Sequence, residues 1–329
     1  MVNEKKLVDL KEGESFTGYL LVDKVEFLKT KTNKDFASVD FADDTKKINA
    51  KIWDVSEENF DIKSRDIVKV VAKTTSFAGN LQLSIEKIEK IPEDSPFNDP
   101  YLFTKKAPIS VEDMKKELNR FYKIIKDENI NYSNIILNIL KKDTSETMEN
   151  SFFTQPAAKM VHHNYMSGLL YHTYRMLQTA EKIVSVYPFL NKALLYSAVI
   201  LHDTGKMVEL TGIEGTDYSE RGLLLGHISI GDSWICEEAT KLGLDPERDE
   251  DIVLLRHLVL SHHGKQEWGS PVSPKVPEAA VLHAVDKLDA ELAQYEEAYI
   301  STNPGEKSSK VFGLGGEIYR AKGNKNVLK

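Results

Sequence analysis

The sequence predicts an α+β protein with two domains, a small β-barrel followed by an all-α domain. Before about residue 92, apolar and polar residues mostly alternate, which is the period of half-buried strands. From residue 110 onward, apolar residues recur every three or four positions, which is the period of amphipathic helices. The stretch PEDSPFNDP between the two regions contains three prolines in nine residues, so it predicts a linker.

We therefore expect a barrel domain at residues 1–92, a linker at 93–109, a helical domain at 110–300 and a Gly- and Lys-rich tail at 301–329. With 329 residues, 41% of them hydrophobic and 29% charged, the chain can build two globular cores. The single cysteine, Cys236, excludes an internal disulfide and fits a reducing cytoplasm, where we expect the protein. No apolar stretch is long enough to cross a membrane. Whether the chain forms a homo-oligomer stays open.

The N-terminal region contains five β-rich runs, at residues 15–30, 35–43, 46–54, 66–79 and 81–91. Five short strands in so little chain favour an OB-fold barrel. Barrels of this kind bind single-stranded nucleic acid by stacking bases on exposed aromatic rings in a basic groove. We expect Phe36, Trp53 and Phe77 to be such rings, with packing in the core as the alternative. The net charge of −8 argues against a protein coated in nucleic acid but leaves room for a local basic groove.

The helical region is expected to begin at Ser110, because Ser110 followed by Asp113 is a typical helix start. Met114, Leu118 and Phe121 then share one face of the predicted helix. From there to about residue 298, nearly every segment has a helical pattern.

All nine histidines lie in this helical region, and several form an ordered series with acids. The series is His172, His202 with Asp203, His227, His262 with His263, and Asp286. Neutral imidazole and carboxylate are the ligands of divalent transition metals at hydrolytic sites. The apolar residues around these positions indicate that the side chains point inward from successive helices, as in the metal sites of helical bundles. A buried His-Asp pair also needs such a role, because a desolvated carboxylate is costly unless it is paired or binds a metal.

The order H…HD…H…HH…D resembles the HD-domain metal-dependent phosphohydrolases, in particular those that can hold two metal ions. The resemblance implies that His172, His202, Asp203 and Asp286 bind a first metal, and that Asp203 bridges to a second metal bound by His227, His262 and His263. Which of His262 and His263 is the main ligand stays open. Lys206 matches the lysine of HDxGK and would reach a substrate phosphate, so Asp203 and Lys206 are the expected catalytic residues. Manganese is the favoured metal, with iron, cobalt or nickel as alternatives.

A longer stretch, QPAAKMVHHNYMSGLLYHT at residues 155–173, goes beyond a general HD site. Together with ILHDTGK, LLGHI and the N-terminal barrel, it is similar to the YhaM-type 3′-to-5′ exoribonucleases of bacteria. Tyr171 stands where members of that family typically have a glutamate. His162, His163 and Tyr165 precede the His172 helix, where a phosphate or base contact is reasonable; a polar loop packed beneath the helix is the alternative.

The leading hypothesis is therefore a metal-dependent 3′-to-5′ exonuclease that acts on single-stranded RNA, with single-stranded DNA as a second substrate. One alternative is a phosphohydrolase of small nucleotides or cyclic dinucleotides, although HHGKQEWGSP lacks the Gly-Tyr-Pro of the cyclic-dinucleotide class. Another is a non-catalytic adaptor that binds nucleic acid, although the intact set of ligands speaks against it.

Overall fold

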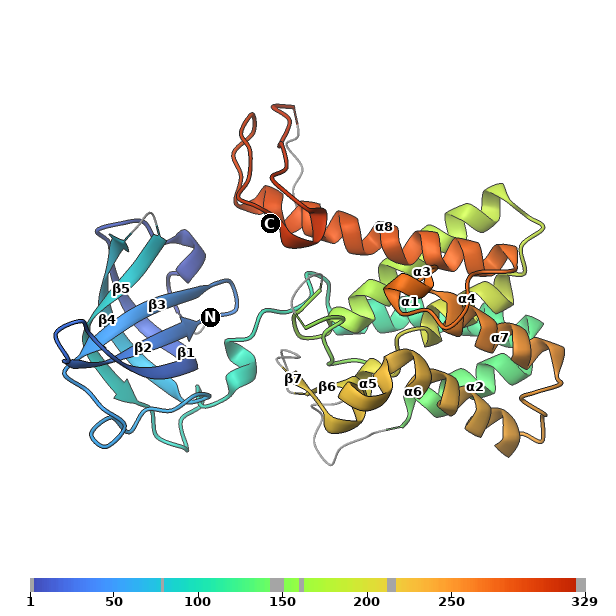
Figure 1. The fold of residues 1–329 in the computed structure, drawn as a ribbon, viewed down its shortest axis with the longest axis horizontal. Helices are drawn as coiled ribbons and strands as arrows, with labels where there is room; N and C mark the ends of the chain where they lie inside the picture. Colours follow the sequence, from blue (N-terminus) through green and yellow to red (C-terminus); the bar gives the residue numbers. More distant parts are fainter. Residues whose placement is uncertain (1–2, 78–79, 143–150, 160–162, 212–216, 324–329) are drawn as a thin grey trace. The chain divides into compact units, whose positions relative to one another are not determined.

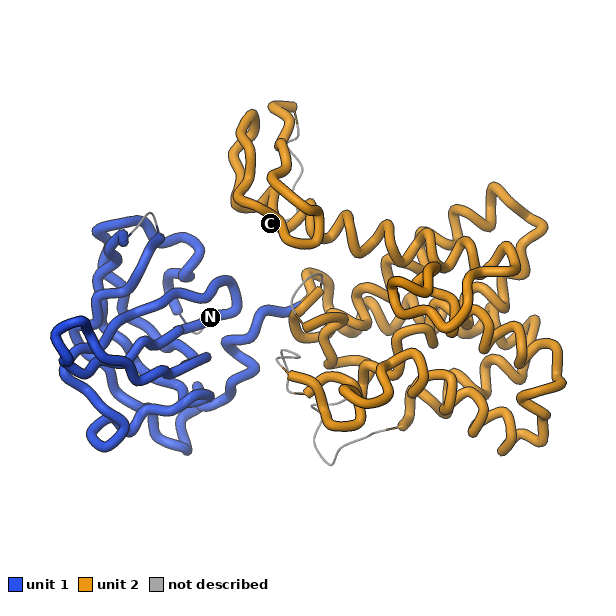
Figure 2. Tube along the Cα trace, in the orientation of Figure 1, with its two compact units in different colours: residues 1–106 blue, residues 107–329 orange. Residues whose placement is uncertain are grey.

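The computed structural model describes residues 3–77, 80–142, 151–159, 163–211 and 217–323 of the chain. The chain divides into two compact units, residues 1–106 and residues 107–329 (Figure 2). The first unit is a β-barrel and the second is built from helices (Figure 1), so the predicted α+β class is confirmed. Among the described residues, no helix is both long and apolar enough to cross a membrane.

Five strands form the closed barrel in the order β1-β2-β3-β5-β4. They are β1 (Ser15–Lys29), β2 (Asp35–Ala42), β3 (Lys47–Trp53), β4 (Ile67–Phe77) and β5 (Asn80–Lys90). β1 pairs with β4 through its first half and with β2 through its second half, and the pairing with β2 has a register shift between Val22 and Lys24. The parallel contact between β3 and β5 closes the barrel, which is the arrangement of an OB-fold.

Alternation along the strands fills the barrel, as the sequence pattern predicts. Phe16 and Leu20 of β1, Val39 and Phe41 of β2, and Val68 of β4 are buried in one cluster. The chain after β5 stays with this unit, because Phe103, next to a short 3-10 helix at Pro100–Leu102, is buried against Leu21, Ala42, Ile67 and Ile91.

Eight helices are described in the second unit. They are α1 (Val111–Glu128), α2 (Ile130–Leu140), α3 (Gly168–Val186), α4 (Lys192–Leu201), α5 (Lys206–Glu209), α6 (Glu220–Lys241), α7 (Glu250–Ser261) and α8 (Pro277–Ile300). Two short strands, β6 (Leu210–Thr211) and β7 (Asp217–Tyr218), pair beside α5. Beyond α8, residues 301–323 form a short folded segment with bridges from Lys307 to Tyr319 and from Val311 to Gly316.

Helix α4 lies at the centre of this unit and determines where the site forms. Every residue from Ala193 to Leu201 is buried, because α4 contacts α1, α2, α3, α7 and α8. Asn191 caps its first turn by accepting a hydrogen bond from the backbone N–H of Leu194. The helix ends at Leu201, so the residues that follow are placed among the surrounding helices.

Candidate metal centre

His202 and Asp203 directly follow α4 and are buried. The chain then turns through Thr204 and Gly205 into α5. A Cβ atom at Gly205 would lie 2.1 Å from the backbone oxygen of His227, so this approach requires a glycine. The close contact brings the segment of α6 that contains His227 next to Asp203.

His227 is oriented by a kink and by an acid. Helix α6 is interrupted at Gly226, whose φ of 69° is a conformation that glycine adopts at little cost. Glu209, at the end of α5, accepts hydrogen bonds from the backbone N–H of His227 at 2.9 Å and from its Nδ1 at 3.0 Å. The imidazole of His227 therefore turns its Nε2 atom toward Asp203.

His172 comes from α3 and meets two acids of α8. Its Nδ1 atom donates to Asp289 at 2.7 Å, and its Nε2 atom lies 3.2 Å from Asp286 Oδ1. Asp289 also contacts His163 Nε2 at 2.8 Å and Arg175 Nε at 2.6 Å. Asp289 is thus held on three sides and fixes the plane of the His172 ring.

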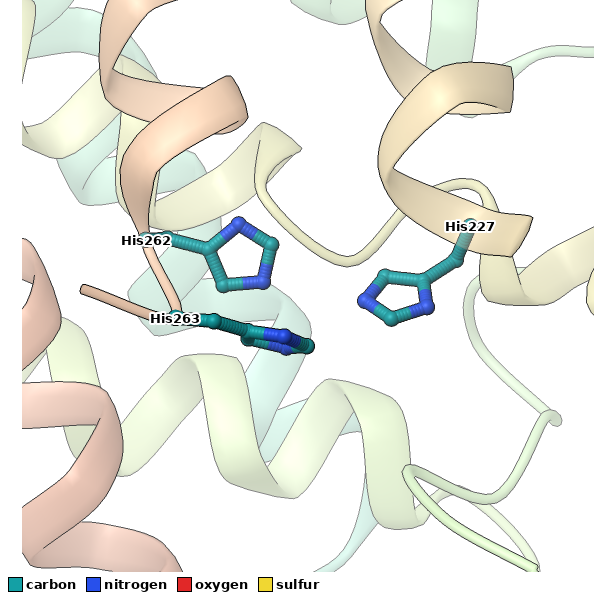
Figure 3. A group of neighbouring side chains, drawn as sticks. All are labelled: His227, His262 and His263. Atoms are coloured by element: carbon teal, nitrogen blue, oxygen red, sulfur yellow. The ribbon is translucent and has the colours of Figure 1, made fainter. Parts of the chain in front are cut away.

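His262 and His263 follow the end of α7. The Nδ1 atom of His262 donates to the carbonyl of Val259 at 2.6 Å, and that of His263 donates to the carbonyl of Trp268 at 2.8 Å. Figure 3 shows both rings facing the ring of His227. One ligand atom from each of these three histidines lies within 4.8 Å of the other two.

The five histidines share one hydrogen-bonding pattern. Each Nδ1 atom faces an oxygen: Asp289 for His172, Val199 for His202, Glu209 for His227, Val259 for His262 and Trp268 for His263. A carbonyl or carboxylate can only accept, so Nδ1 bears the hydrogen and Nε2 presents its lone pair. This is the arrangement by which proteins orient histidines toward a metal ion.

The Nε2 atoms divide between the two oxygens of Asp203. Oδ2 lies 3.2 Å from His202 Nε2 and 4.0 Å from His172 Nε2. Oδ1 lies 3.4 Å from His227 Nε2 and 3.8 Å from His262 Nε2. One oxygen therefore faces each group of histidines, as expected of a carboxylate shared by two ions.

The donor atoms of this centre suit divalent metal ions, because several of them find no hydrogen-bond partner within the protein. Among the described residues of this centre, the buried atoms His202 Nε2, Asp203 Oδ1, His227 Nε2 and His262 Nε2 have no partner with hydrogen-bond geometry. Several unsatisfied atoms at one point would be costly in a core without a ligand, and each of them is a good donor to a transition metal.

The charges at the centre keep the ligands in their metal-binding forms. Burial raises the pKa of Asp203, but Lys206 and His202 outweigh it and hold that pKa well below its usual value. Burial, with the nearby His202, lowers the pKa of His262 far below the ordinary value. Burial also lowers the pKa of Lys206, yet the Asp203 carboxylate raises it more, so the ammonium stays charged.

His172 differs from the other histidines because two acids flank it. Burial lowers its pKa, but the hydrogen bonds to Asp286 and Asp289 outweigh this and raise the pKa to about 10. A metal ion at Nε2 would replace that proton, since ligand histidines bind in the neutral form.

Lys206 lies beside the Asp203 carboxylate and at a cavity. Its Nζ atom is 2.7 Å from Asp203 Oδ2. The cavity has a volume of about 300 Å³, and Asp203, Lys206, His263 and Asp286 line one part of it. A phosphate group in this cavity would contact both the ammonium and the proposed metal ligands.

Neither His163 nor Tyr165, in the described part of the segment before α3, is among the residues that line this cavity. His163 is buried, and its Nδ1 atom lies 2.7 Å from the hydroxyl of Tyr165 while Nε2 contacts Asp289. His163 and Tyr165 therefore support His172 from behind, which matches the alternative of a polar loop packed beneath the helix. His162, the third residue predicted here to contact substrate, lies outside the described residues.

The three barrel aromatics surround Lys51, whose Nζ atom lies 5.8, 5.9 and 5.2 Å from the ring centres of Phe36, Trp53 and Phe77. Trp53 is 55% exposed and Phe77 is 63% exposed, whereas Phe36 is only 9% exposed. The Phe36 ring is tilted against the Trp53 ring, with 5.1 Å between the ring centres, and leaves little of its own surface for a base. Trp53 and Phe77 therefore remain the candidates for base stacking on this face.

Sequence reasoning missed two acids that orient ligands, Asp289 and Glu209. The signal for Asp289 was its spacing, because it follows Asp286 by three residues and lies on the same face of α8. Asp289 supplies His172 with a carboxylate that orients its ring. No spacing pointed to Glu209, since it faces His227 only through the kink at Gly226.

Replacing Asp289 with asparagine is expected to weaken metal binding at the His172 group by about 10- to 100-fold, because the ring loses the carboxylate that orients it. Metal content would be measured after dialysis against graded concentrations of a chelator. Glu296→Gln is the matched control, since Glu296 pairs with Arg175 at 2.5 Å. Equal retention of metal by both variants would contradict the assigned role.

Comparison with known proteins finds a family model that matches part of the helical unit. Residues 169–291 match the HD domain family model. This HD domain contains all seven proposed metal ligands, and it indicates a metal-dependent phosphohydrolase. Among solved structures, the second OB-fold domain of replication protein A from Methanococcus maripaludis is 22% identical to the part it matches. The match covers 28% of this chain and 97% of that domain, with a TM-score of 0.23.

Proposed function

We propose that this protein is a 3′-to-5′ exonuclease that hydrolyses the phosphodiester bonds of single-stranded RNA with two divalent transition-metal ions. The main observation behind the proposal is the division of the Nε2 atoms between the two oxygens of Asp203. A carboxylate placed in this way suits a pair of ions better than a single one. Manganese is the metal we favour, because histidines and carboxylates together suit it.

The residues of this chain have distinct roles in the proposed reaction. When bound, such ions activate water for attack and neutralise the charge that develops on the phosphate. Lys206 adds a fixed positive charge at the wall of the cavity, where it can bind a phosphate oxygen without displacing a metal ligand. Asp289 and Glu209 keep the imidazoles of His172 and His227 in the tautomer that the ions require.

The barrel supports a polymeric substrate rather than a free nucleotide. Trp53 and Phe77 present exposed rings 5.9 and 5.2 Å from the Lys51 ammonium, a combination that can stack bases and bind a phosphate beside them. A small-nucleotide phosphohydrolase would have no use for this face. The direction of cleavage rests on the resemblance to the YhaM-type enzymes.

The proposal is tested by incubating the protein with manganese and an RNA oligomer labelled at its 5′ end. A ladder that shortens from the 3′ end is the expected result, and single-stranded DNA in a parallel reaction measures the preference for RNA. An intact strand together with hydrolysis of nucleotides or cyclic dinucleotides would favour the small-nucleotide phosphohydrolase. A strand that is bound but never cut would favour the adaptor.

A further inference from the structure

Trp268 lies at the same cavity as the proposed metal ligands. Asp203, Lys206 and Asp286 line one part of the cavity, and Trp268, His283 and Lys287 line another. The volume of about 300 Å³ is at the lower end of the range for small-molecule sites. Such a space suits one nucleotide better than several.

The loop that contains Trp268 is fixed to the metal centre and to α8. The carbonyl of Trp268 accepts the hydrogen bond from His263 Nδ1 at 2.8 Å. Gly264, with a φ of +80°, packs so closely that a Cβ atom there would lie 2.4 Å from the His283 ring. The backbone of Trp268 therefore has a defined position relative to the ligands.

The Trp268 side chain is not part of the hydrophobic core. It is 47% exposed, whereas Trp234, which packs in the core, is 5% exposed. The Nζ atoms of Lys265 and Lys287 lie 4.7 and 5.7 Å from its ring centre, and the His283 ring lies at 5.9 Å. Both ammonium groups are on flexible stems, so a flat ligand can take their place over the ring while they move to its phosphates.

We propose that Trp268 is a base-stacking residue for the terminal nucleotide of the strand, whose phosphodiester lies over Asp203 and Lys206. This inference rests on the proposed exonuclease function and adds to it a binding site for the nucleobase inside the helical unit. Lys287 binds a phosphate beside that base. Because every base has a flat face, the site accepts all four nucleotides and reads no sequence.

A fluorescent base at the 3′ end of the strand tests the inference. The probe is an RNA oligomer with 2-aminopurine as its last base, mixed with the full-length protein in EDTA so that it stays intact. Stacking on Trp268 should quench the fluorescence at saturating protein, and Trp268→Ala should abolish that quenching. With manganese, the same variant should show a KM for the oligomer raised by about tenfold, the value for one stacked base.

Control variants separate stacking from loss of structure. Trp268→Phe should restore quenching and KM, and Trp53→Ala on the barrel should leave the quenching at saturation unchanged. The backbone carbonyl that binds His263 remains in Trp268→Ala, so this variant should bind as much metal as the wild type. Full quenching by Trp268→Ala would overturn the inference. If the wild type quenches the probe through Trp268 but never shortens it with manganese, the exonuclease proposal fails and the base site stands.

Discussion

Replacing Asp203 with asparagine is expected to reduce hydrolysis by on the order of a thousandfold or more. An amide offers one neutral oxygen, so it cannot bridge two ions, and the transition state loses several kcal/mol of stabilisation. Both groups of histidines should lose metal together, because each faces one oxygen of this carboxylate. Metal content and rate should be measured on the same preparation.

The fold of this variant needs its own control, since Lys206 would lose its buried partner. Removing one member of a buried ion pair typically costs about 3–5 kcal/mol, so a lower melting temperature is expected without loss of the folded state. Asp245→Asn, an exposed acid 3.8 Å from Arg248, is the matched replacement outside the site. Two tightly bound ions and near-normal turnover in Asp203→Asn would refute the bridging assignment.

Removal of residues 1–106 is expected to leave an active HD domain that binds long RNA poorly. The second unit has its own core, so cutting before Ala107 should leave it folded. The apparent KM for long RNA should rise at least tenfold, because the barrel supplies binding energy remote from the reacting phosphate, while kcat on a dinucleotide should change little.

The salt dependence of RNA affinity gives this truncation a second measurement. Contacts between lysines and phosphates release counterions, so the full-length protein should lose affinity more steeply with salt than the truncated one. A double variant, Trp53→Ala with Phe77→Ala, separates stacking from charge because it keeps the lysines. This double variant should bind RNA more weakly, but its RNA affinity should depend on salt concentration as steeply as that of the wild type. Identical slopes and affinities for full-length and truncated protein would mean that the barrel does not bind the strand.

The sequence predicted the fold class because periodicity is a local property. Alternation of apolar residues in the barrel strands and their three- to four-residue spacing in the helices follow from which face is buried. The buried residues of the barrel and of α1 show both patterns. The same logic failed to separate Phe36 from Trp53. These two residues pair across β2 and β3, yet one is 9% exposed and the other 55%, a difference that alternation along a strand does not predict.

The candidate site was predictable as a set of residue types, because buried histidines beside acids are rare unless they serve a metal. The contacts that orient them were not predictable, since these join distant parts of the chain. Asp289 is 117 residues from His172 and 126 residues from His163. Trp268 gave no signal either, because a single exposed tryptophan becomes meaningful only when the cavity beside it is known.

The placement of the metal ligands also has a consequence for how the protein unfolds. The proposed ligands come from the start of α3, the end of α4, the kink of α6, the end of α7 and the middle of α8, so ions at this centre would tie five segments of one unit together. A ligand that binds only the folded state adds its binding free energy to that state. In a calorimeter, metal should therefore raise the melting temperature of the helical unit and leave that of the barrel where it was. The difference between the two transitions would then report metal occupancy without any substrate.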